Sequence, residues 1–280
     1  MGKILKFEVK RMFRSKTLYA AIFIGVILGI WLLGIEVKEM LQTNEIISLY
    51  GIEKMGLYYP RSVFNSFIGL EYAYLPSSML YSIFPVLVVL PYAITFYQDK
   101  KSGYLKNILL CCTRKQYYVA KYITVAASGI IVVGAILIFS LIISMMVFPF
   151  LSPEFSTNLF SPMSAEQMWT ELFVKSPFAY TLLYCVIDAV FFSLIAELSL
   201  LASTWMKNSM SVFLFPMLSY FIVGYMLSEL GLEKYNPLAF LRPCQIAGEA
   251  DFIVILIEAI VLFLITSIGF VKIGARQDVF

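Results

Sequence analysis

Residues 123–150 read ITVAASGIIVVGAILIFSLIISMMVFPF, a run of 28 positions without a charged side chain. A helix needs about 20 consecutive apolar residues to cross the hydrocarbon core of a bilayer, and this run exceeds that length. In the whole chain of 280 residues, 60% are hydrophobic and 14% are charged, against roughly 25% charged in an average soluble domain. A soluble core cannot hide that much apolar surface, so the sequence predicts an integral membrane protein.

Five further apolar runs reach a spanning length, which predicts an all-α protein with six transmembrane helices. The six runs lie at 18–35, 80–97, 123–150, 178–204, 211–227 and 252–273. The first run has no small-residue cleavage site after it, so it is interpreted as a span and not as a signal peptide. Pro85, Pro91 and Pro216 fall inside the second and fifth runs, where they either act as hinges or only shape the packing.

The placement of Lys and Arg predicts the orientation, because such residues concentrate in cytoplasmic loops. Fifteen of them lie in the N-terminal arm, after spans two and four, and in the tail, and six lie in the three other connections. The sequence therefore predicts a multi-pass plasma-membrane protein with both termini in the cytoplasm. Residues 1–17 and 98–121 are then cytoplasmic, and residues 36–79, 151–177 and 228–251 are extracellular.

The N-terminal arm, residues 1–17, combines basic and apolar residues. At 100° per residue, Ile4, Leu5 and Met12 gather toward one side. This pattern favours a cytoplasmic helix at the membrane interface, with the basic side chains meeting lipid headgroups. The alternative is a basic arm without structure that only sets the topology.

Several kinds of catalytic or metal site are disfavoured by what the chain lacks. It has no histidine, the commonest metal ligand and general base, and no phosphate-binding loop or G-x-S-x-G motif. Cys111, Cys112, Cys185 and Cys244 form no C-x-x-C pair and are interpreted as small apolar residues. We therefore expect no catalytic residue, metal or cofactor in this chain.

Three acids, Asp188, Glu197 and Glu258, lie within the predicted spans. Acids at membrane depth are costly and point by default to function, for example to an ion pathway. Asp188 and Glu197 are nine positions apart, so they face opposite sides of one helix, about 13 Å apart along it. The other interpretation is that each acid is hydrogen-bonded to a neighbouring helix and serves the packing.

Three segments, together with the predicted layout of six spans and two cytoplasmic termini, resemble the permease subunit of type-2 ABC transporters, the membrane subunit of ABC exporters. The basic arm is similar to the family's cytoplasmic elbow helix. Residues 99–121, DKKSGYLKNILLCCTRKQYYVAK, are similar to its loop between spans two and three, although Tyr104 stands where the family commonly has threonine. Residues 236–243, NPLAFLRP, are similar to the re-entrant element before span six.

The resemblance implies that the loop carries a short coupling helix, which docks in a groove of a separate ATPase subunit. Two permeases, copies or paralogues, would pair with two ATPases, which bind ATP and magnesium. No nucleic-acid partner is expected. The docking residues it implies are Gly103, Leu105, Lys106, Leu109, Thr113 and Arg114.

In that interpretation Gly103 allows a sharp helix start, and Leu105 with Leu109 fills an apolar groove of the ATPase. Arg114 pairs with an acid of the ATPase or caps the loop. The alternative is a solvated basic loop that only sets topology.

The predicted function is thus export of, or immunity to, a peptide or hydrophobic compound, with no enzymatic activity in this chain alone. A different class, an ion-coupled secondary transporter or channel, would use Asp188, Glu197 and Glu258. Such transporters often show visible inverted repeats, and none is evident in this sequence. A membrane-embedded enzyme is the least favoured class, because the chain has neither histidine nor a nucleophile motif.

Overall fold

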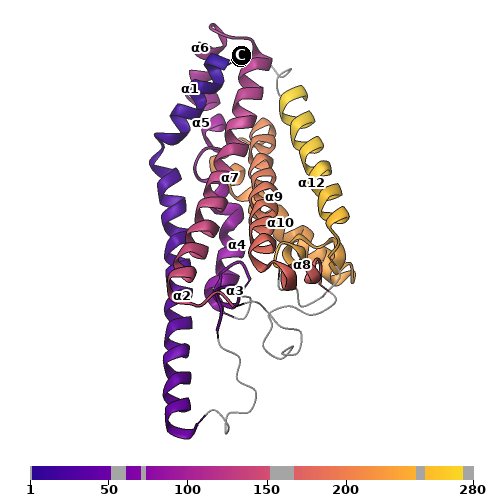
Figure 1. The fold of residues 1–280 in the computed structure, drawn as a ribbon. Coiled ribbons are helices and arrows are strands. Elements are labelled where there is room, and N and C mark those ends of the chain that lie inside the picture. Colours follow the sequence, from indigo (N-terminus) through magenta and orange to yellow (C-terminus); the bar gives the residue numbers. More distant parts are fainter. Residues whose placement is uncertain (1, 52–60, 71–73, 152–166, 244–249, 274–280) are drawn as a thin grey trace.

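The computed structural model describes residues 2–51, 61–70, 74–151, 167–243 and 250–273. Within these ranges the regular elements are all helices, and no strand occurs. Figure 1 shows an elongated bundle, with α1 (Gly2–Phe13) and α6 (Tyr104–Leu109) at one end and α3 (Val63–Ser66) and α8 (Thr170–Lys175) toward the other. The all-helical prediction is therefore confirmed for the described residues.

Five helices in the described ranges are long and apolar enough to cross a membrane. They are α2 (Lys16–Tyr50), α7 (Arg114–Val147), α9 (Pro177–Trp205), α10 (Ser209–Glu229) and α12 (Phe252–Ser267), the last continued by η4 (Ile268–Ile273). Large apolar side chains cover the outer faces of α2 and α12, such as Phe23 and Ile253, which are 65% and 61% exposed. Apolar outer faces on long helices indicate a multi-pass membrane protein.

The second predicted span is not one helix, which corrects the expected helix over 80–97. The structure has α4 (Leu75–Val89), a turn, and then α5 (Thr95–Lys101). Pro91 has no N–H to donate to a carbonyl of the preceding turn, so the ladder of helical hydrogen bonds is interrupted there. The hydroxyl groups of Ser15 and Thr17 donate to the Pro91 carbonyl at 3.4 and 3.2 Å, so the turn is joined to the start of α2.

The first predicted span, residues 18–35, was too short. Helix α2 continues through residues 36–50, which were expected to form a loop. Glu36 and Glu39 lie on this extension, and both pair with Arg61. The Ser66 hydroxyl also donates to Glu36 at 3.3 Å. Glu36 is fully buried, so these partners on the segment after α2 supply the contacts that a buried carboxylate requires.

The centre of the bundle is α9, whose apolar stretch is 83% buried. It packs along α7, and Figure 1 shows the two helices side by side over much of their length. A Cβ added at Gly129 of α7 would lie 2.8 Å from the Ser193 Cα of α9, so this crossing requires a glycine. Such close approach through small residues is typical of helix packing in membranes.

The segment before the last span contains η3 (Glu233–Tyr235) and the short helix α11 (Pro237–Phe240). Asn236 caps α11, since its side-chain oxygen accepts from the Leu238 N–H at 2.9 Å. Phe240 and Leu241 are fully buried, so this segment is inserted into the fold. The predicted re-entrant segment, residues 236–243, is described, whereas residues 244–249 of the predicted extracellular segment 228–251 lie outside the described residues.

Candidate functional site

The N-terminal helix α1 carries the one acid of its basic arm, Glu8, on its buried face. Glu8 and Met12 are one helical turn apart and both are fully buried, whereas Lys3, Lys6 and Lys10 are exposed. The buried face points toward α7, the helix against which α1 packs. A carboxylate in this position requires a partner of opposite charge.

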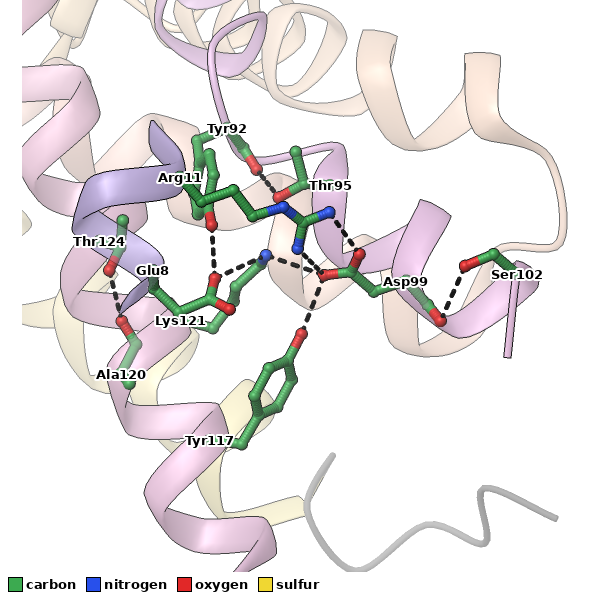
Figure 2. A network of polar contacts seen from close by, with 10 residues as sticks. All are labelled: Glu8, Arg11, Tyr92, Thr95, Asp99, Ser102, Tyr117, Ala120, Lys121 and Thr124. Atoms are coloured by element: carbon green, nitrogen blue, oxygen red, sulfur yellow. Dashed lines mark hydrogen bonds and ion pairs between the residues drawn. The ribbon is translucent and has the colours of Figure 1, made fainter. Parts of the chain in front are cut away.

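Lys121 of α7 supplies that partner and connects Glu8 to α5. Its Nζ atom lies 3.1 Å from a Glu8 carboxylate oxygen and 3.1 Å from a carboxylate oxygen of Asp99 on α5. The Lys121 and Glu8 side chains are 0% exposed and that of Asp99 is 3% exposed. Figure 2 shows the amine between the two carboxylates.

Arg11 of α1 closes the cluster from the outer side. Its two terminal nitrogens donate to the two oxygens of Asp99 at 2.9 and 2.7 Å, a bidentate pair (Figure 2). The guanidinium also lies 5.2 Å from the ring centre of Tyr104, the first residue of α6. Arg11 thus connects α1 with both α5 and α6.

Two tyrosines add hydrogen bonds to the acids. Tyr117 of α7 donates to Asp99 at 3.0 Å, and Tyr92, in the turn before α5, donates to Glu8. The Lys121 amine also lies 4.3 Å from the centre of the Tyr92 ring. Each acid therefore has both a cationic and a hydroxyl partner.

The charge cluster, defined as Glu8, Arg11, Asp99 and Lys121, carries two negative and two positive charges and is neutral as a whole. Burial by itself would raise the pKa of the Asp99 carboxyl. The hydrogen bond and charge of Arg11 and the charge of Lys121 outweigh burial and hold that pKa below its usual value. The hydrogen bond to Asp99 likewise raises the pKa of the Arg11 guanidinium.

Beside the charge cluster, the chain reverses between α5 and α7 through the short helix α6. Gly103 precedes α6 with a φ of 75°, in the left-handed region that favours glycine. A Cβ at Gly103 would meet nothing within 4 Å, so the constraint is the backbone conformation and not crowding. Thr113 then caps α7 by accepting from the Gln116 N–H at 3.4 Å.

The structure brings the six predicted docking residues into this one connection, but their side chains do not all face outward. Leu105 is fully buried and Leu109 packs against the core of the chain, which does not fit the expected insertion of both into a groove of a partner. Lys106 and Thr113 are exposed, and Arg114 is the first residue of α7. The exposed apolar side chain of this connection is Leu110, which is 87% exposed.

The charge cluster was not predicted as a unit. Glu8 stood alone among basic residues, and Lys121 lies inside the long helix α7 and not in a loop. Both charges are unexpected. Glu8 is an acid in a basic segment, and Lys121 is a charged side chain inside a long, mostly apolar helix. Of the two, only the sign of Glu8 could be seen in the sequence, because residues 98–121 were expected to form a loop.

The three acids of the predicted spans lie in separate surroundings. Asp188 accepts from Tyr81 of α4 at 2.9 Å, and Glu197 accepts from Thr266 of α12 at 3.3 Å. Glu258 instead lines a cavity between α9, α10 and α12. Asp188 and Glu197 thus face different helices, as their spacing predicted, and the described hydrogen bonds do not join the three acids into one relay.

No group of three or more metal-ligating side chains occurs among the described residues. No protein-family model matches the chain, and a search of curated proteins found no match either. The geometry of the chain itself therefore has to carry any functional proposal.

Proposed function

We propose that this chain is the permease subunit of an ATP-driven exporter of the ABC type, and that the connection α5–α6–α7 docks on a separate ATPase subunit. The observation that carries the proposal is the construction of this connection. The short helix α6 follows a left-handed glycine and lies at one end of the bundle (Figure 1). Lys106 within α6 and Leu110 just after it are exposed. An exposed apolar side chain at the tip of a charged turn suits a protein partner.

The charge cluster links the connection α5–α6–α7 to the long helices of the bundle. Asp99 lies just before α6, Lys121 lies within the first turns of the long helix α7, and Glu8 and Arg11 lie on α1. Buried ion pairs in fixed geometry make these three segments move together, since separating them leaves charges unpaired. A push on α6 by the ATPase would therefore reach α7 and α1 as one unit.

Six crossings and cytoplasmic termini belong to the same proposal. The pair α4 and α5 would act as the sixth crossing, broken at Pro91. Phe270, near the end of the last span, packs on Phe96 of α5 and Tyr118 of α7, so that end lies beside the charge cluster. An even number of crossings would put α1 and this end on the same side of the plasma membrane, and the excess of Lys and Arg makes that side the cytoplasm.

In this proposal α11 is the re-entrant element before the last crossing, and a second permease copy or paralogue completes the path. The cargo would be a peptide or hydrophobic compound taken up from the bilayer. The apolar outer faces of α2 and α12 offer surfaces for contact with lipid, cargo or a second permease.

The experiment is co-purification of the tagged chain from native membranes, followed by identification of the proteins that accompany it. We expect an ATPase subunit with the wild-type chain and its loss with Leu110→Asp, because a charge at the docking tip opposes burial against a partner. Leu230→Asp is the matched control, since Leu230 is exposed just after α10, outside the docking connection. An intact chain without any ATPase under gentle extraction would contradict the proposal.

A further inference from the structure

A cavity of about 550 Å³ lies between α9, α10 and α12. Its walls include Phe191 and Ile195 of α9, Tyr220 and Val223 of α10, and Val261 of α12. Volumes of this size are typical of pockets for small ligands, which are mostly apolar with a few polar groups. Figure 1 shows α12 standing alongside α9 and α10, the three helices that form these walls.

One member of the described lining carries a formal charge, the acid Glu258 of α12. Its carboxylate has no hydrogen bond or ion pair among the described residues, and its side chain is partly buried. Asp188 and Glu197 differ from it, since each accepts a hydrogen bond from a hydroxyl group. Glu258 is thus the acid of the spans that faces a space and not a partner.

An unpaired carboxylate at membrane depth is costly, and a cation placed against it removes part of that cost. Phe191 and Tyr220 line the same cavity, and aromatic rings attract cations. The other lining atoms are suited to an apolar body. Val223 and Val261 line the cavity and are 48% and 47% exposed, so the cavity reaches the outer surface of α10 and α12.

We propose that this cavity binds a membrane-partitioning amphiphile with an apolar body and a cationic amine, and that the amine pairs with Glu258. The ligand enters from the bilayer between α10 and α12, and its apolar part lies against α9. Binding requires only the folded chain, so this inference stands apart from the proposed coupling to an ATPase.

The test uses the full chain in nanodiscs of phosphatidylcholine at neutral pH, with tritiated dodecylamine as the probe and dodecanol as its neutral counterpart. We expect saturable binding of dodecylamine and at least about tenfold weaker binding to Glu258→Gln, because a charge-assisted contact is lost. Dodecanol should bind both proteins alike. Glu229→Gln, at the exposed end of α10, should bind dodecylamine like the wild type.

A second variant tests the cavity and not the charge. Val223→Trp fills the space from α10 and should weaken both probes, while Glu258→Gln keeps the shape and isolates the charge. An unfolding midpoint for each variant shows that it is folded. The inference is overturned if wild-type protein shows no saturable binding of dodecylamine, or if Glu258→Gln binds it with wild-type affinity. Neither result depends on whether an ATPase partner exists.

Discussion

Replacing Lys121 by methionine should destabilise the protein strongly, because it leaves two buried carboxylates facing each other. The Lys121 amine makes two ion pairs of 3.1 Å from a side chain that is 0% exposed. Removing one partner of a buried ion pair typically costs about 3–5 kcal/mol. Methionine keeps most of the volume of lysine, so the loss measures the charge and not a cavity.

The double variant Glu8→Gln, Lys121→Met makes the prediction specific to the pairing. It keeps the cluster neutral, because Arg11 still balances Asp99 through its bidentate contact. We therefore expect the double variant to regain at least about 1.5 kcal/mol relative to the sum of the two single changes, within the usual range for contacting residues. Glu8→Gln alone should also destabilise, since it leaves Lys121 and Arg11 with one acid.

The assay is unfolding of the purified chain by sodium dodecyl sulfate in mixed micelles, followed by tryptophan fluorescence. Lys115→Met is the matched control, because Lys115 lies on the same helix and is exposed; it should change the free energy of unfolding by about 0.5 kcal/mol or less. Wild-type stability of Lys121→Met would refute the reasoning. Strict additivity of the two single changes would refute the claim that they belong to one network.

Three further changes test other parts of the structure. Gly103→Ala should destabilise the protein by about 1–2 kcal/mol in the same unfolding assay, because alanine disfavours the left-handed backbone. Gly134→Ala, inside α7 with open space around it, should stabilise it by about 0.5–1 kcal/mol. Equal effects would contradict the left-handed conformation of Gly103. Leu105→Asp should lower the free energy of unfolding by more than about 2 kcal/mol, since it buries an unpaired charge, whereas Leu110→Asp should change it by less than about 0.5 kcal/mol. A larger loss for Leu110→Asp than for Leu105→Asp would show that Leu110, and not Leu105, faces inward. The folded pKa of Asp99 lies below the ordinary value of about 3.9, so the stability that the Asp99 carboxylate contributes is present above that pH and is lost as the pH falls through the folded pKa. When unfolding midpoints are measured from pH 6 to pH 3, Asp99→Asn should therefore lose less stability than the wild type. Parallel curves for the two proteins would contradict this.

The long apolar helices could be predicted from the sequence because the signal is simple. An uncharged run such as 123–150 is long enough to span a bilayer, and the structure places the long helix α7 over most of it. The prediction of the second span as one helix was wrong, because hydropathy does not show where a backbone turns. Pro91 marked the break, but a proline inside a span can equally be accommodated as a kink.

The extension of α2 was missed for the opposite reason. Residues 36–50 contain several charges, so composition favoured a loop, yet Glu36 and Glu39 find a partner in Arg61, far along the chain. Contacts of this kind are decided by packing and are not visible in a local pattern. The charge cluster shows the same limit, since its members come from residues 8, 11, 99 and 121.

The connection between α5 and α7 was singled out from the sequence, but which of its side chains face inward was not predicted. The resemblance implied a short helix in this loop, and α6 lies there, between Gly103 and the Thr113 cap of α7. Which leucine points outward depends on how α6 leans on the rest of the chain. Leu105, which was expected to face a partner, is buried, whereas Leu110, to which no role was assigned, is exposed.

The central claim, that α6 is the contact with an ATPase, is tested most directly by photocrosslinking in native membranes. A photoreactive benzoyl-phenylalanine is placed at position 110, and in a control chain at position 257, an exposed site on α12. We predict that position 110 crosslinks to a nucleotide-hydrolysing subunit and that position 257 does not. Crosslinks from position 110 to lipid alone, or to the same proteins as position 257, would contradict the account.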